Sequence, residues 1–132
     1  MRVLLVGNSE KAGNLAGALA GTDLAVDRHP DGATHADGAD EVDQIARDLR
    51  ELERVLGENR PDAVLVASAS NTALAAALVA TKLEVPLLRL ELPGEHSSGR
   101  NADLIDQLAD ASLAPEAAAI VDWVRDTYTP RA

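Results

Sequence analysis

The chain has 132 residues and a formal net charge of −10, from 22 acidic against 12 basic residues. This excess of acids repels phosphate groups and anionic lipid headgroups, so the composition argues against nucleic-acid and membrane-surface partners. The chain contains no cysteine, which excludes disulfides, thiolate catalysis and cysteine-based zinc sites. Its length and its 46% of hydrophobic residues predict one domain, residues 1–132, with a sizeable aliphatic core.

The chain starts with Met1 and the short aliphatic run Arg2–Val6. A secretory signal needs a longer apolar region and a membrane span needs about 20 apolar residues, so the run fits neither. A short, continuous aliphatic run is typical of a buried strand in a parallel sheet. We therefore expect a first strand here, no membrane segment and a cytoplasmic location.

Helix and strand signals then alternate. After the turn at Gly7 and Ser9, apolar residues recur at helical spacing to about Ala20. Leu24–Val26 is a possible second strand. Residues 27–40 hold four aspartates, two glycines and a proline but no large apolar residue, which predicts a loop.

The clearest helix signal spans Glu41–Leu56. Its apolar side chains fall on one helical stripe, formed by Val42, Ile45, Leu49, Leu52, Val55 and Leu56. Gly57 is a plausible end for this helix. Further strands are predicted at Ala63–Ala67, Pro86–Leu90 and Ala111–Leu113, and further helices at Ala73–Leu83, Asn101–Ala109 and from Pro115 to about Tyr128.

This alternation predicts an α/β fold, a three-layer sandwich with a Rossmann-like parallel sheet of about five strands in the order 3-2-1-4-5. In such a sheet, ligand sites lie at the carboxyl ends of the strands. Two predicted turns there bring polar groups and free N–H groups to a helix start, which favours a bound anion. Helix capping by the same side chains is the alternative interpretation. The residues concerned are Gly7, Asn8, Ser9, Ser68, Ser70, Asn71 and Thr72.

Glu91, Glu95 and His96 follow the fourth predicted strand. A carboxylate and an imidazole at this place can exchange protons with a substrate, and a solvated loop is the alternative. His29 and His35 lie among aspartates, but we expect that loop to be solvated and to bind no metal. No cofactor is predicted.

Two blocks of sequence carry a family resemblance. The first reads PDAVLV from Pro61 and NTALAAA from Asn71, and the second runs from Asn101 through LIDQLAD to Ala114 and Pro115. In order and in gapless spacing, they resemble the N-terminal domain of the non-hydrolysing UDP-N-acetylglucosamine 2-epimerases. The corresponding family patterns are P-D-x-V-L-V-H-G-D-T-x-T-x-L-A-A-A-L and E-E-x-N-R-x-L-x-D-x-L-A-D followed by A-P.

The resemblance also implies departures from a working epimerase. The family's acid/base aspartate falls on Ala69, its Glu-Glu pair falls on Ser98-Gly99, and its nucleotide-facing first-loop arginine falls on Ser9. Glu91 alone matches a family active-site acid, so it is the candidate catalytic residue. Because the sequence ends after the fifth predicted helix, we expect no second domain of the kind that grips UDP in this family.

The expected function follows from these departures. The resemblance implies a non-catalytic, stand-alone relative of the epimerase N-terminal domain, which acts as a partner or regulator in sugar-nucleotide metabolism and has a UDP-sugar as its possible ligand. The alternative is a half-enzyme that completes an epimerase or glycosyltransferase site with a separate C-terminal subunit. We also expect a homodimer or a partner subunit, because the alanine-rich helix and the last helix together offer more apolar surface than the short strands cover.

Overall fold

The computed structural model describes residues 1–7, 9–30, 41–91 and 100–128. Within these ranges five strands alternate with five helices. The strands are β1 (Arg2–Val6), β2 (Ala25–His29), β3 (Ala63–Val66), β4 (Leu87–Leu90) and β5 (Ala111–Leu113). The helices are α1 (Glu10–Ala20), α2 (Glu41–Asn59), α3 (Asn71–Lys82), α4 (Arg100–Leu108) and α5 (Ala117–Tyr128). None of these helices is both long enough and apolar enough to cross a membrane.

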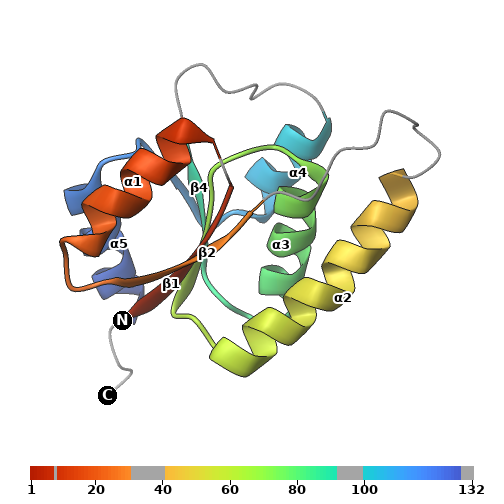
Figure 1. Ribbon diagram of the computed structural model, residues 1–132, viewed down its shortest axis with the longest axis horizontal. Helices are drawn as coiled ribbons and strands as arrows, with labels where there is room; N and C mark the ends of the chain where they lie inside the picture. The colour runs from red at the N-terminus through yellow and green to blue at the C-terminus, as the bar shows by residue number, and fades with distance from the viewer. Residues whose placement is uncertain (8, 31–40, 92–99, 129–132) are drawn as a thin grey trace.

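The five strands form one parallel sheet in the order β2-β1-β3-β4-β5. Helices α1 and α5 cover one face, while α2, α3 and α4 cover the other (Figure 1). The predicted fold class, a three-layer α/β sandwich around a parallel sheet, is therefore confirmed.

The predicted strand order 3-2-1-4-5 is wrong, because β3 pairs directly with β1 and leaves β2 at the edge of the sheet. β2 is only partly buried and ends in Asp27, Arg28 and His29, which the sequence analysis assigned to a loop. β3 is buried along its whole length. A sheet covered on both faces needs aliphatic strands at its centre, and its edge tolerates charged ones.

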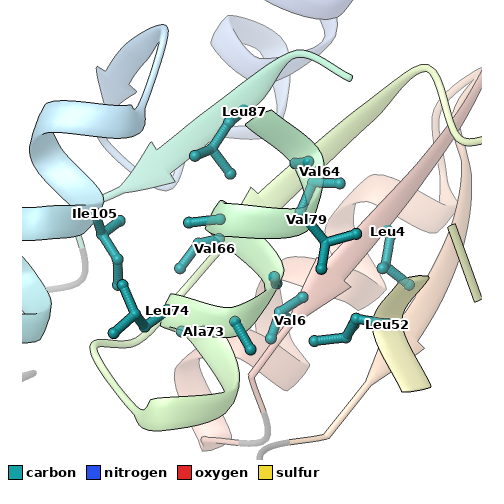
Figure 2. Packing of buried hydrophobic residues seen from close by; sticks show 14 of the residues in the cluster. Leu4, Val6, Leu52, Val64, Val66, Ala73, Leu74, Val79, Leu87 and Ile105 are labelled. Atoms are coloured by element: carbon teal, nitrogen blue, oxygen red, sulfur yellow. The ribbon is translucent and has the colours of Figure 1, made fainter. Parts of the chain in front are cut away.

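The core lies in two layers, one on each face of the sheet. Because successive side chains of a strand point to opposite faces, Val3 and Leu5 pack toward α1 and α5, whereas Leu4 and Val6 pack toward α2 and α3. Figure 2 shows the second layer, in which aliphatic side chains of β1, β3 and β4 meet the three helices of that face.

Helix α3 is buried along most of its length, as its sequence predicts. It lies between α2 and α4, and both pack against it (Figure 1). The alanine-rich helix, one of the two apolar surfaces that suggested a homodimer, is thus covered within a single chain, and self-association stays a prediction.

Predicted helix boundaries differ from the structure by up to three residues, and two of the differences change how a helix ends or begins. α2 continues past Gly57 to Asn59 and closes at Arg60, whose φ of +40° turns the chain out of the helix. α5 begins at Ala117, so Pro115 precedes the helix and does not occupy its first turn. Both differences lie at helix ends, where local sequence signals are weakest.

Candidate functional site

All five described helices begin at the carboxyl edge of the sheet, because each follows a parallel strand, and α1, α3 and α4 follow the three central strands β1, β3 and β4 (Figure 1). A helix start exposes unpaired N–H groups and a partial positive charge, so three such starts at one edge favour a bound anion. The predicted site residues Gly7, Ser9, Ser68, Ser70, Asn71, Thr72 and Glu91 all lie at this edge. Asn8, Glu95 and His96 lie outside the described residues.

Gly7 directly follows β1 in a conformation that other residues rarely adopt. Its φ is +141°, and a Cβ placed on it would lie 3.2 Å from the Cβ of Ala67. Its N–H donates to the carbonyl of His29 at 3.1 Å, and its carbonyl accepts from Nη2 of Arg28 at 2.7 Å. The turn is therefore held from β2 on one side and packs directly on the end of β3 on the other.

Serine hydroxyls cap the two helices that start beside this turn. The Oγ of Ser9 accepts from the N–H of Ala12 at 3.1 Å, and the Oγ of Ser70 accepts from the N–H of Ala73 at 3.0 Å. The Oγ of Ser68 lies 3.2 Å from that of Ser70. The capping interpretation is confirmed for Ser9 and Ser70, and each cap leaves the other N–H groups of its first turn facing the edge.

A chain of side-chain amides links the starts of three helices. Nδ2 of Asn71 on α3 donates to Oε1 of Gln44 on α2 at 3.3 Å. Nδ2 of Asn101 on α4 donates both to Oδ1 of Asn71, at 3.0 Å, and to the carbonyl of Ala69, at 3.1 Å. The first turn of α3 is thus tied to both helices that flank it.

A buried side-chain contact between α2 and α3 lies beneath this chain of amides. Oγ1 of Thr72 donates to Oδ2 of Asp48 at 2.9 Å, where Thr72 is 1% exposed and Asp48 is 9% exposed. A buried polar group that loses its partner keeps the whole cost of its desolvation. Asp48 therefore fixes α2 against α3 just beneath the edge.

Asp48→Ala is expected to lower the free energy of unfolding by roughly 1–3 kcal/mol, because it leaves the buried hydroxyl of Thr72 without this acceptor. Asp48→Asn is expected to cost clearly less, since the amide oxygen can still accept that hydrogen bond. Urea unfolding followed by circular dichroism measures both variants. Equal losses for the two would mean that the charge of Asp48, and not its role as an acceptor, is what matters.

Glu91 directly follows β4 and is exposed. Its N–H donates to the carbonyl of Leu113 at 2.9 Å, and its Oε1 accepts from Oγ of Ser112 at 3.1 Å. β5 therefore holds both the backbone and the carboxylate of Glu91. An exposed carboxylate that accepts one hydroxyl hydrogen bond from the described residues can also contact a ligand hydroxyl.

Only the first residues of the predicted acidic loop lie in the described part of the chain. Asp27 and His29 lie on β2, whereas Asp31, His35, Asp37 and Asp40 fall outside the described residues. In the part of the chain that the structure describes, no group of three or more His, Asp or Glu side chains is arranged to hold a metal ion.

Four residues at this edge were missed by the sequence analysis: Arg28, Gln44, Asp48 and Asn101. Gln44 and Asp48 stand four residues apart on α2 and so share one face, beside the apolar stripe. This i,i+4 polar pair next to a buried stripe is a signal that could have marked them. Val42, which the stripe included, is 76% exposed.

Comparison with known proteins identifies this architecture. The family model described as UDP-N-acetylglucosamine 2-epimerase matches residues 11–120. This chain belongs to the UDP-N-acetylglucosamine 2-epimerase family. The UDP-N-acetylglucosamine 2-epimerase of Methanococcus maripaludis is 39% identical over 79 residues, which cover 55% of this chain and 21% of that protein.

Solved structures of this epimerase family share the fold. The Methanocaldococcus jannaschii UDP-GlcNAc 2-epimerase, in complex with UDP-GlcNAc and UDP, superposes with a TM-score of 0.70 at 22% identity, over 96% of this chain and 43% of that chain. The Neisseria meningitidis enzyme bound to UDP-GlcNAc gives a TM-score of 0.69 at 19% identity, over 97% and 42%. This chain thus spans about a fifth of the curated epimerase it matches and less than half of the solved ones, where it corresponds to an N-terminal part.

Proposed function

We propose that this chain binds a nucleotide sugar of the UDP type at the carboxyl edge of its sheet, without catalysing epimerisation by itself. It then serves as a partner or regulator in sugar-nucleotide metabolism. Two observations carry this proposal together. The serine-capped starts of α1 and α3 lie at one edge of the sheet. In addition, an alanine, Ala69, stands where the resemblance places the family's acid/base aspartate.

Binding is supported by three features of the edge. The starts of α1 and α3 present N–H groups and dipole ends to it. Gly7 lets the turn after β1 pack directly against Ala12 and Ala67, which keeps the start of α1 close to the end of β3. The guanidinium group of Arg28 lies at the carbonyl of Gly7, where it adds a positive charge that can face a phosphate.

The absence of activity is supported by what occupies the catalytic positions. Losing one general acid or base typically costs roughly 100- to 10,000-fold in rate. Ala69 offers no proton, and its carbonyl accepts a hydrogen bond from Asn101. Glu91 retains a carboxylate, but epimerisation by elimination and re-addition of UDP needs several acids and bases in place.

Binding is tested with two variants of one capping residue. Ser70→Asn and Ser70→Asp both keep a good helix cap, so both should unfold at nearly the same urea concentration as the parent chain. The aspartate, however, adds a negative charge at the start of α3. Calorimetric titration with UDP should then give parent-like affinity for Ser70→Asn and at least about tenfold weaker binding for Ser70→Asp, because a carboxylate close to the diphosphate repels it. Equal affinities of the two variants for UDP would mean that UDP does not bind at this edge of the sheet.

Catalysis is tested by incubating the pure chain with UDP-N-acetylglucosamine and separating the epimers by anion-exchange chromatography. No conversion is expected. The alternative function, a half-enzyme, is favoured by the retained Glu91 and tested by adding a separately produced C-terminal part of a family member. Turnover that appears only in the mixture, and disappears with Glu91→Gln, would show that the chain is a half-enzyme and would contradict the regulatory role.

A homodimer is proposed as the assembly state, and light scattering tests it. The chain mass is 13.8 kDa, and the net charge of −10 opposes association, so added salt should strengthen any dimer. A single-chain mass at every protein and salt concentration would rule this assembly out.

A further inference from the structure

A cavity of about 520 Å³ lies at the amino edge of the sheet, at the end opposite the candidate site. Its walls come from the segments that lead into β4 and β5 and from the last turns of α3, α4 and α5. Apolar walls are formed by Val85, Pro86 and Leu108. Its volume lies in the range of about 300–1,000 Å³ that is usual for small-molecule sites.

The electrostatics of this cavity favour a cation. Three helices end around it, and the C-terminal end of a helix carries a partial negative charge. Two carboxylates line it, Glu84 and Asp110, and none of the described residues that line it is basic. Of the bases in the last turns of these helices, Arg125 pairs with Asp23, and Lys82 is exposed outside the lining.

The indole of Trp123 supplies the aromatic wall of the cavity. Trp123 is half-buried and packs against the core layer beneath α1 and α5, which fixes the ring in place. A cation over the face of a tryptophan is attracted by the quadrupole of the ring, whose face is electronegative. This attraction is stronger where water is excluded.

The two carboxylates differ in their structural roles. Asp110 accepts the N–H of Leu87 through Oδ2 at 2.8 Å, so it also anchors the start of β4. Glu84 has a φ of +58°, a conformation that glycine adopts with less strain. A carboxylate, Glu84, thus lines the cavity at a position whose backbone conformation favours glycine.

From this arrangement we propose that the cavity is a binding site for a free small organic cation, an alkylammonium compound held between Trp123, Glu84 and Asp110. The carboxylates and the helix ends neutralise its charge, and the indole and the apolar walls contact its alkyl groups. The site lies apart from the carboxyl edge and is independent of the function proposed there.

The experiment uses choline as the probe and its neutral isostere 3,3-dimethylbutanol as the matched control. Trp123 is the one tryptophan in the chain, so its fluorescence reports on this cavity directly. Choline chloride should change the emission saturably, whereas the isostere and equimolar sodium chloride should not. Saturation-transfer NMR on the trimethylammonium protons gives a second readout that does not depend on fluorescence. Equal responses to choline and its isostere, or no transfer to choline, would overturn the proposal.

Two charge-neutralising variants complete the test. Glu84→Gln should weaken choline binding by roughly two- to fivefold, the effect of losing one exposed charge pair. Glu51→Gln removes the same charge from an exposed position on α2 that does not line the cavity, and it should bind like the parent chain. Glu84→Gly should raise the urea midpoint while it weakens binding, which separates the site from general stability. Parent-like choline binding by Glu84→Gln would refute the proposal.

Discussion

Gly7→Ala is expected to lower the free energy of unfolding by roughly 2–4 kcal/mol, because it combines backbone strain with a steric clash. The φ of +141° lies where a Cβ is strained, and the new methyl group would sit 3.2 Å from the Cβ of Ala67. Ala67 cannot move easily, since its N–H donates to the carbonyl of Val6 inside the sheet. Urea unfolding followed by circular dichroism measures the loss.

Gly17→Ala is the matched control for this substitution. Gly17 lies in the middle of α1, and a Cβ there would meet nothing within 4 Å. Alanine in an exposed helix interior should therefore stabilise the chain by about 0.5–1 kcal/mol. The two glycine-to-alanine changes are expected to have opposite signs, and a stabilising Gly7→Ala would contradict the conformation described for the turn after β1.

Leu65→Ala is expected to cost roughly 2–5 kcal/mol, the usual range for a leucine removed from a closed core. Leu65 is fully buried at the centre of β3, opposite Leu5 of β1 and Leu88 of β4. All three side chains point into the layer beneath α1 and α5. Because the neighbouring strands are fixed by the parallel ladder, the layer cannot collapse fully into the space that the leucine leaves.

Leu104→Ala removes the same atoms from an exposed place and serves as the control. Leu104 on α4 is 44% exposed, so little cavity forms and alanine is a good helix former. A change within about 0.5–1 kcal/mol is expected. Similar losses for Leu65 and Leu104 would mean that the central strand is less closely packed than its burial indicates.

The fold class could be predicted from the sequence because its signals are local. Short apolar runs marked β1, β3 and β4, helical periodicity marked α2, and a longer alanine-rich run that is apolar on nearly every face marked α3. The strand order depends instead on where each crossover returns to the sheet, which no local pattern encodes. The charged residues Asp27 and Arg28 were the available signal, since they suit an edge strand, and they were assigned to a loop.

The same distinction applies to the candidate site. The caps at Ser9 and Ser70 act within three residues of themselves, so their type and position sufficed to predict them. The contact of Asp48 with Thr72 and that of Asn71 with Asn101 join residues 24 and 30 positions apart. Such pairs become visible only once the helices are packed side by side.

The amide chain from Gln44 through Asn71 to Asn101 affects the entropy cost of binding a ligand at the start of α3. Each amide in it has lost its rotational freedom during folding, together with the backbone of the turn to which it is tied. A molecule that binds at this turn therefore loses little free energy to the ordering of these side chains. If the proposed ligand binds here, more of the contact energy remains as affinity, because less is spent on ordering these side chains.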